Sequence, residues 1–194
     1  MKILRVPFKK QMLNDSCFPA SVDMVLRFYG DIVNEKKLAE STKLSEQDGS
    51  SDVKIGQVLL RKGYNVTTFW NGSIHQWNEE KSITRLYKKE YRKSIKLGLK
   101  RKRNATLSLM KFFIDKNIPV LVEVSATKFY GKKLDYTHVV VVTGYDKRYF
   151  YINDPDKKLG GKKKITLKKF GRSWKNLYSG FGRSMFVVTP KINS

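Results

Sequence analysis

The sequence predicts an α+β protein, with helices concentrated in the first half of the chain and β-strands in the second. Apolar residues recur at helical spacing in segments that end before residue 63. After residue 118, β-branched and aromatic runs bounded by turn residues predict strands. The pattern is not the regular alternation of a doubly wound α/β fold, and the 194 residues fit a single domain.

The first helix is predicted over residues 17–29, after an extended segment Met1–Gln11. Ser16 stands at the cap position, Pro19 lies in the first turn, and Gly30 follows where the helix should end. The apolar residues at helical spacing are Phe18, Val22, Val25, Leu26 and Tyr29.

Two more helices and a strand follow. One helix fits Asn34–Leu44. The other fits Val53–Lys62, with Asp52 as its cap and Gly63 after its end. A short strand then fits Asn65–Phe69.

The middle of the chain is polar, basic and helical in character. We expect residues 72–104 to form a basic helical insertion within one domain, 1–194. Its sparse apolar anchors are Trp77, Leu86, Tyr87 and Tyr91. A further helix is predicted over Leu107–Lys116.

The remaining elements are predicted strands: Pro119–Val124, Thr137–Thr143, Tyr149–Asn153 and Ser184–Thr189. Residues Tyr145–Arg148 between the second and third of them predict a tight hairpin. Residues 157–175 are interpreted as a Lys-rich loop, in which the pair Gly160–Gly161 forms a flexible turn.

The formal charge of +23 is unevenly distributed. Residues 1–56 are close to neutral, with nine Lys or Arg and eight Asp or Glu. Residues 88–103 carry a net charge of +8, and residues 157–175 carry nine bases and no acid. A surplus of this kind is common in nucleic-acid-binding proteins, but it also suits an acidic peptide or another polyanionic surface. The charge therefore indicates a preference among partners, and nucleic acid is not the favoured one.

Composition excludes several classes of protein. A single Cys excludes an internal disulfide framework and a zinc site built on several thiolates. No run approaches the ~18 apolar residues that a membrane span needs. Charges and a proline interrupt the first eleven residues before a signal segment could form. We therefore expect a cytoplasmic protein.

Cys17 is the first candidate for chemistry. It begins the predicted helix, where unpaired backbone N–H groups and the positive end of the helix dipole stabilise a thiolate. A lone Cys is more often simply a buried apolar residue. A nucleophilic role requires a base to accept the thiol proton and a third group to orient that base.

The base has two candidates. His138 opens the buried-looking strand THVVVV, where an imidazole needs a polar partner; a bond to a backbone carbonyl is the simpler alternative. His75, in the polar middle region, is interpreted as a surface residue without a role.

The orienting group is sought across the predicted hairpin, because its second strand returns beside the start of the first. Asn153 or Asp154 stands there, just before Pro155. A carboxylate at that point can accept the imidazole N–H, although Asp-Pro is also a common turn opener. Gln11, six residues before Cys17, could donate its amide to an oxyanion, or lie in a surface loop.

Residues 11–30, QMLNDSCFPASVDMVLRFYG, and residues 137–156, THVVVVTGYDKRYFYINDPD, together resemble the papain-like cysteine peptidases of the bacteriocin-processing, double-glycine-leader family. The segments RKGYNVTTF (61–69) and NIPVLVEV (117–124) are also similar to that family, so the resemblance spans most of the chain outside residues 72–104. One departure is Phe18, because the family usually has Gly directly after the nucleophile.

The resemblance implies a stand-alone member with a papain-like fold, in which an N-terminal helical part carrying the Cys helix packs on a C-terminal antiparallel sheet. It implies Cys17 as nucleophile, His138 as base, Asp154 as orienting group and Gln11 as oxyanion donor.

The predicted function is a thiol hydrolase that cleaves a peptide or amide bond, or transfers the acyl group to an amine, without metal or organic cofactor. The expected partner is a peptide or protein, with an acidic substrate suited to the charge. The alternative is a weak or inactive peptidase-fold protein that holds nucleic acid or another polyanion on its basic face. A structural or immunity-type protein is a third possibility, for which the sequence offers no positive feature.

Overall fold

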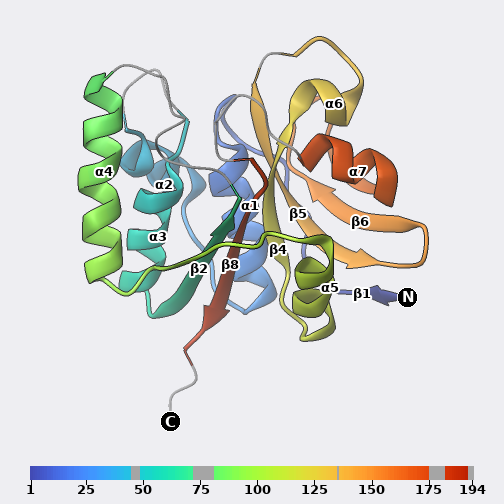
Figure 1. Cartoon of the computed structure of the whole chain (residues 1–194), viewed down its shortest axis with the longest axis horizontal. Helices are drawn as coiled ribbons and strands as arrows, with labels where there is room; N and C mark the ends of the chain where they lie inside the picture. Colours follow the sequence, from blue (N-terminus) through green and yellow to red (C-terminus); the bar gives the residue numbers. More distant parts are fainter. Residues whose placement is uncertain (45–48, 72–80, 135, 175–181, 192–194) are drawn as a thin grey trace.

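A sheet of eight strands lies between helices on its two faces (Figure 1). The computed structural model describes residues 1–44, 49–71, 81–134, 136–174 and 182–191, without the side chains of residues 81–83. The described helices are α1 (Cys17–Phe28), α2 (Glu35–Thr42), α3 (Asp52–Arg61), α4 (Lys81–Lys96), α5 (Leu107–Asp115), α6 (Ala126–Tyr130) and α7 (Leu167–Trp174). The described strands are β1 (Lys2–Ile3), β2 (Tyr64–Trp70), β3 (Lys100–Lys102), β4 (Val120–Ser125), β5 (Thr137–Tyr145), β6 (Tyr149–Asp154), β7 (Gly161–Thr166) and β8 (Ser184–Pro190).

The sheet runs in the order β3-β2-β8-β4-β5-β6-β7, and β1 adds to β5. Every described pairing is antiparallel except the parallel pair β2–β3. Strands β5 and β6 form the predicted hairpin, in register from Val141 opposite Asn153 to Tyr145 opposite Phe150, with an irregularity between Val142 and Gly144. The mixed fold confirms the predicted α+β class.

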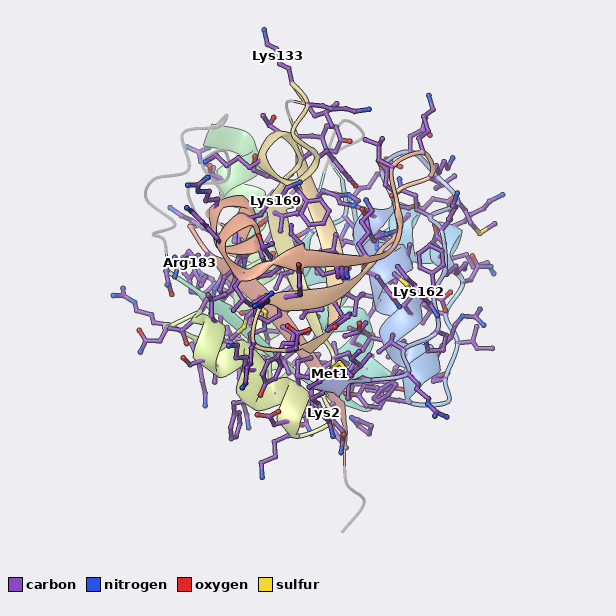
Figure 2. The ribbon with its side chains drawn as sticks, turned by 90° about the vertical axis from the view of Figure 1, so that its right-hand side faces the viewer. Met1, Lys2, Lys133, Lys162, Lys169 and Arg183 are labelled. Carbon is purple, nitrogen blue, oxygen red and sulfur yellow. The ribbon has the colours of Figure 1, made fainter. Side chains whose placement is uncertain are left out.

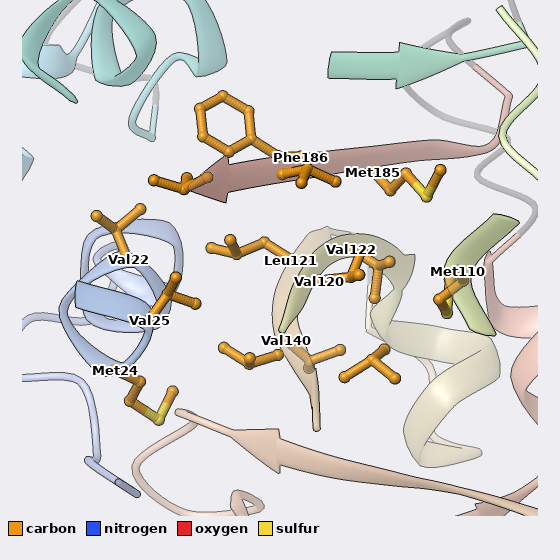
Figure 3. Packing of buried hydrophobic residues seen from close by; sticks show 14 of the residues in the cluster. Val22, Met24, Val25, Met110, Val120, Leu121, Val122, Val140, Met185 and Phe186 are labelled. Atoms are coloured by element: carbon orange, nitrogen blue, oxygen red, sulfur yellow. The ribbon is translucent and has the colours of Figure 1, made fainter. Parts of the chain in front are cut away.

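The core fills both faces of the central strands (Figure 3). Val22 and Val25 of α1 pack from one side, and Met110 of α5 packs from the other, with Leu121 and Val140 of the sheet between them. Because both faces are covered, β4 and β5 are buried along most of their length. This explains why they read as continuous apolar runs rather than as an alternating pattern.

Most of the predicted elements are present with small shifts at their ends. Asn34 caps α2, and its side chain accepts from the N–H of Lys37 at 3.0 Å. The predicted cap of α3 is wrong by one residue, because Ser51 occupies that position. Asp52 lies in the first turn and accepts a hydrogen bond from the hydroxyl of Tyr87 at 3.2 Å, which ties α4 to α3.

The Lys-rich loop predicted for residues 157–175 is wrong. Strand β7 and helix α7 occupy most of it, and β7 pairs along its length with β6. Gly160 closes the turn after β6, where its N–H bonds the carbonyl of Asp156 at 3.1 Å, and a Cβ there would overlap the carbonyl oxygens of Asp154 and Asp156. Its missing side chain lets the chain pass close to the end of β6.

Two other elements were not expected from the sequence. The short helix α6 follows β4 directly, and the three-residue strand β3 adds to the edge of the sheet within the predicted insertion. His75 and Trp77 lie outside the described residues. Among the residues that the structure describes, no helix has the length and apolar character needed to cross a membrane.

Candidate active site

Helix α1 begins at Cys17, so the thiol lies at the positive end of the helix. The N–H of Ala20 bonds the carbonyl of Ser16 at 2.9 Å, which closes the first turn. Pro19, which has no N–H, lies in that turn, where a backbone donor has no intrahelical partner. Ser16 occupies the cap position, but its hydroxyl makes no capping bond. Cys17 is half-buried, as access by a substrate would require.

The start of α1 lies against β5. Ser21 donates from its hydroxyl to the carbonyl of Val139 at 3.2 Å, which fixes the helix one residue from His138. On the sheet, the imidazole of His138 is 2 % exposed and its Nε2 lies 2.7 Å from Oδ1 of Asp154, at the end of β6. Cys17 is close enough to His138 to contribute to the raised pKa of the imidazole. The structure therefore places the thiol at the start of α1 beside the buried pair of His138 and Asp154.

Asp154 has further partners that sequence reasoning missed. The carboxylate is fully buried and accepts from the hydroxyl of Tyr130 at 3.1 Å, from Nζ of Lys163 at 2.8 Å and from the N–H of Asp156 at 3.1 Å. Nζ of Lys163 lies 4.8 Å from the ring centroid of Tyr130 and also donates to the carbonyl of Leu159. These donors hold the carboxylate ionised and fix its orientation.

Neither partner of Asp154 is evident from the sequence pattern. Lys163 stands in the run Lys162–Lys164, where every residue has the same charge, and only the strand register turns it toward Asp154. Tyr130 belongs to α6, a five-residue helix too short for a periodic pattern. The sequence of residues 161–166, GKKKIT, has no alternation of polar and apolar residues that could have indicated the orientation of Lys163.

The two ionisable groups shift each other's pKa in opposite directions. Burial lowers the pKa of His138, but the hydrogen bonds to Asp154 and Cys17 outweigh it and raise the value to about 10. Burial raises the pKa of Asp154, while the hydrogen bonds from His138 and Lys163 lower it to about 2. A charged imidazolium beside an ionised carboxylate is therefore the stable state at neutral pH.

Gln11 lies in the loop that leads to Cys17. Its side chain is buried, and its amide donates to the carbonyls of Leu13 and Asn14, both at 2.8 Å. Its backbone N–H bonds the carbonyl of Pro155 at 2.8 Å, so the loop is attached next to Asp154. Both amide hydrogens are thus engaged by the chain itself, and donation to an oxyanion requires that one of these bonds open.

A buried carboxylate supports the same loop from behind. Oε1 of Glu35, at the start of α2, accepts from the N–H of Met12 at 2.5 Å and from the hydroxyl of Ser16 at 2.7 Å. Nζ of Lys9 lies 3.3 Å from the other oxygen of Glu35 and 2.8 Å from Asp23 of α1. This network, which the sequence did not indicate, attaches the loop before Cys17 to both α1 and α2.

Phe18, the residue after Cys17, packs into the sheet. Its ring meets that of Phe186 edge to face, with the centroids 5.2 Å apart. The side chain is half-buried against the core. The departure from the usual Gly therefore adds an aromatic contact between α1 and β8.

The fold is that of papain-like cysteine peptidases: a helix that starts at a cysteine and packs on an antiparallel sheet that carries a histidine. A model of the peptidase C39-like family matches residues 3–180, and the chain belongs to that family. This confirms the family resemblance inferred from the sequence. No curated protein matches the chain.

Solved structures give the same fold. One is a double-glycine-motif protease from an AMS/PCAT transporter in complex with the leader peptide, at TM-score 0.57 and 20% identity, covering 98% of this chain and 95% of that one. Another is the peptidase domain of Streptococcus ComA, a bifunctional ABC transporter of a quorum-sensing pathway, at TM-score 0.61 and 17% identity, covering 96% and 100%. A third is classed as a C39-like peptidase, from Bacillus anthracis, at TM-score 0.52 and 20% identity, covering 97% and 98%.

Proposed function

We propose that this protein is a cysteine peptidase in which Cys17 is the nucleophile, His138 the acid and base, and Asp154 the orienting group. The observation that carries the proposal is the buried pair of His138 Nε2 and Asp154 Oδ1, 2.7 Å apart, which lies beside the thiol at the start of α1. Nucleophile, base and orienting group stand in the order that thiol catalysis requires.

In the first step, the Cys17 sulfur attacks the carbonyl carbon of the scissile bond. The imidazolium of His138 gives its proton to the leaving nitrogen as the carbon–nitrogen bond breaks, which leaves a thioester and a free amine. In the second step, His138 takes a proton from water, the hydroxide attacks the thioester, and the thiol and the acid are released. Asp154 keeps the imidazole in one orientation throughout.

The oxyanion of each tetrahedral intermediate forms beside the start of α1. We propose the Cys17 N–H as one donor, because helix N-termini direct backbone donors at developing negative charge. Gln11 is the second proposed donor, and it serves once its amide turns away from Leu13 or Asn14.

A peptide is the proposed substrate. The transporter protease described above was solved with a leader peptide, and this chain shares its family and fold. Peptides that contain a double-glycine sequence are therefore the first to test. The comparisons lend no support to the alternative of an inactive fold that binds nucleic acid.

The proposal is tested by incubating the protein with a peptide library and identifying new termini by mass spectrometry. The wild-type chain should generate them, Cys17→Ala should generate none, and Asp154→Asn should lower kcat/KM by about 10²–10⁴-fold. Replacement of the other histidine, His75→Ala, is the matched control and should leave cleavage unchanged. New termini produced equally by Cys17→Ala would overturn the proposal.

The same experiment in water labelled with heavy oxygen separates hydrolysis from acyl transfer. Hydrolysis places the label in the new carboxyl terminus, because water is the second nucleophile. Transfer to an added amine gives an unlabelled amide instead.

A further inference from the structure

A basic pocket lies over α6 and α7. Two of the residues that line it, Lys169 and Arg183, are labelled in Figure 2. The pocket is an open depression of about 920 Å³, lined by Lys128, Thr166, Leu167, Lys168, Lys169, Gly171, Arg172 and Arg183. Its volume is within the range of about 300–1,000 Å³ usual for ligand pockets. We refer to these eight residues as the basic pocket.

The charge of the basic pocket is uncompensated. Five of its residues are cations and none is an acid. Within the described part of the chain, none of the five forms an ion pair, whereas the buried acids Asp23, Glu35 and Asp154 each do. The same excess of positive charge extends over the C-terminal part of the sequence, because residues 157–194 contain eleven Lys or Arg and no Asp or Glu. Several cations around one concave surface focus a positive potential that attracts anions.

The shape and composition of the basic pocket indicate which class of anionic ligand it can bind. Trp174 and Phe170 of α7 are fully buried, and among the described residues no aromatic side chain lines the pocket, so this lining offers single-stranded nucleic acid no surface for base stacking. An open depression does not match the flat surface of a membrane. A polypeptide with closely spaced carboxylates can enter it, with its backbone over Leu167 and Gly171 and its side chains toward the rim.

The basic pocket is connected to the candidate active site through α6. Lys128 lines the pocket, and Tyr130, two residues later on the same helix, donates to Asp154. Strand β7 makes a second connection, since it carries Lys163 beside Asp154 and ends at Thr166 in the pocket. One polypeptide can therefore occupy both places if it passes over α6.

We propose that the basic pocket binds an acidic segment of the substrate polypeptide, away from the bond that is cleaved. The proposal rests on the proposed peptidase function and specifies its substrate class as peptides with a cluster of Asp or Glu outside the cleavage site. Such a contact contributes binding and leaves the chemical step to Cys17 and His138.

Binding is measured by fluorescence anisotropy with a labelled Glu-rich peptide and the full-length Cys17→Ala protein, at about 0.15 M salt, where distant charges are screened. The pocket variant is Lys168→Glu/Lys169→Glu/Arg172→Glu, three exposed positions of α7. It should weaken binding at least about tenfold, because short-range charge contacts are reversed. A peptide with Gln in place of Glu should bind neither protein.

The matched control places the same three reversals on α4, as Lys89→Glu/Arg92→Glu/Lys96→Glu. These side chains are also exposed and belong to the other basic segment, so both variants lose the same net charge. The control should change the affinity less than about twofold. Equal weakening by both variants would mean that net charge alone attracts the peptide, and would overturn the proposal.

Two further experiments test other ligands and a milder variant of the basic pocket. If the pocket variant loses binding to duplex DNA or to anionic lipid vesicles and keeps its affinity for the peptide, the pocket serves that other partner and the proposal fails. If the triple variant does not fold, as judged by circular dichroism, Lys169→Gln/Arg172→Gln replaces it, with an expected loss of about threefold. Unchanged affinity in that folded variant would also contradict the proposal.

The binding readout does not depend on cleavage, because the Cys17→Ala protein is used throughout. Loss of the proposed peptidase function would leave the anisotropy result intact. With active protein, the pocket variant should raise KM for an acidic substrate and leave kcat unchanged, while a neutral substrate is cleaved as before.

Discussion

Asp154 is shared between two cations, and this sets the basicity of His138. Lys163 and His138 approach opposite oxygens of the same buried carboxylate, at 2.8 and 2.7 Å. The positive charge of Lys163 disfavours a second positive charge on the imidazole while it anchors the carboxylate. Lys163 thus keeps the pKa of His138 below the value that Asp154 alone would produce.

Replacing Lys163 by Met should therefore raise the pKa of His138 above about 10. The expected shift is about half a unit to one unit, the usual effect of a nearby charge that is partly exposed. The measurement is an NMR titration of the imidazole signals, which is simple because the chain has only two histidines. Lys162→Met, on the exposed neighbour, is the control. An unchanged or lowered pKa in Lys163→Met would contradict this assignment.

At the scale of elements, the loop from Gln11 to Ser16 is held by its neighbours rather than by its own structure. Glu35 of α2 binds Met12 and Ser16, and Lys9 bridges Glu35 to α1. Removing this carboxylate leaves the N–H of Met12 without its acceptor and leaves the buried hydroxyl of Ser16 bonded to Leu13 alone.

We expect Glu35→Ala to lower the free energy of unfolding by about 1–3 kcal/mol, the cost of losing hydrogen bonds to a buried charged group. It should also slow alkylation of Cys17, because the start of α1 is no longer fixed. Glu40→Ala, exposed on the same helix, is the control and should change stability by less than about 0.5 kcal/mol. Urea unfolding measures the free energy of unfolding of both variants. An equal loss in Glu35→Ala and Glu40→Ala would show that the hydrogen bonds of Glu35 do not stabilise the loop.

The elements also show what the sequence can predict. Helix α1, the hairpin β5–β6 and strands β4 and β8 follow from local patterns, because apolar periodicity and turn residues report burial directly. The position of His138 relative to Asp154 follows from that hairpin, whereas the place of Cys17 beside them was implied by the family resemblance. Strand β7 and helix α7 were missed because a run of lysines conceals which side chains face the sheet. The contacts of Tyr130, Lys163 and Glu35 depend on tertiary packing, so no local sequence pattern indicates them.

For the whole molecule, the paired imidazole and carboxylate make stability depend on pH. The native state holds the proton of His138 more tightly than the unfolded chain, whose pKa is about 6.5. The contribution of His138 to the free energy of unfolding is therefore complete below pH ~6.5 and is lost as the pH rises toward about 10. Asp154 has a lowered pKa, so its contribution is complete above pH ~3.8 and is lost as the pH falls toward about 2.

Urea unfolding of the wild-type chain and His138→Gln at several pH values measures this dependence. The difference in unfolding free energy between them should shrink as the pH rises from about 6.5 to about 10. Titration of the many Lys and Tyr residues affects both proteins and cancels in the difference. A difference that stays constant or grows over this range would contradict the assignment.

Alkylation with iodoacetamide at neutral pH measures whether His138 activates Cys17. Because Cys17 is the single cysteine of the chain, incorporated label reports on it alone. We expect rapid labelling of the wild-type protein and of His75→Ala, and labelling at least about tenfold slower in His138→Ala, since only the thiolate is the reactive form. Equal rates in the wild-type protein and His138→Ala would show that His138 does not activate Cys17.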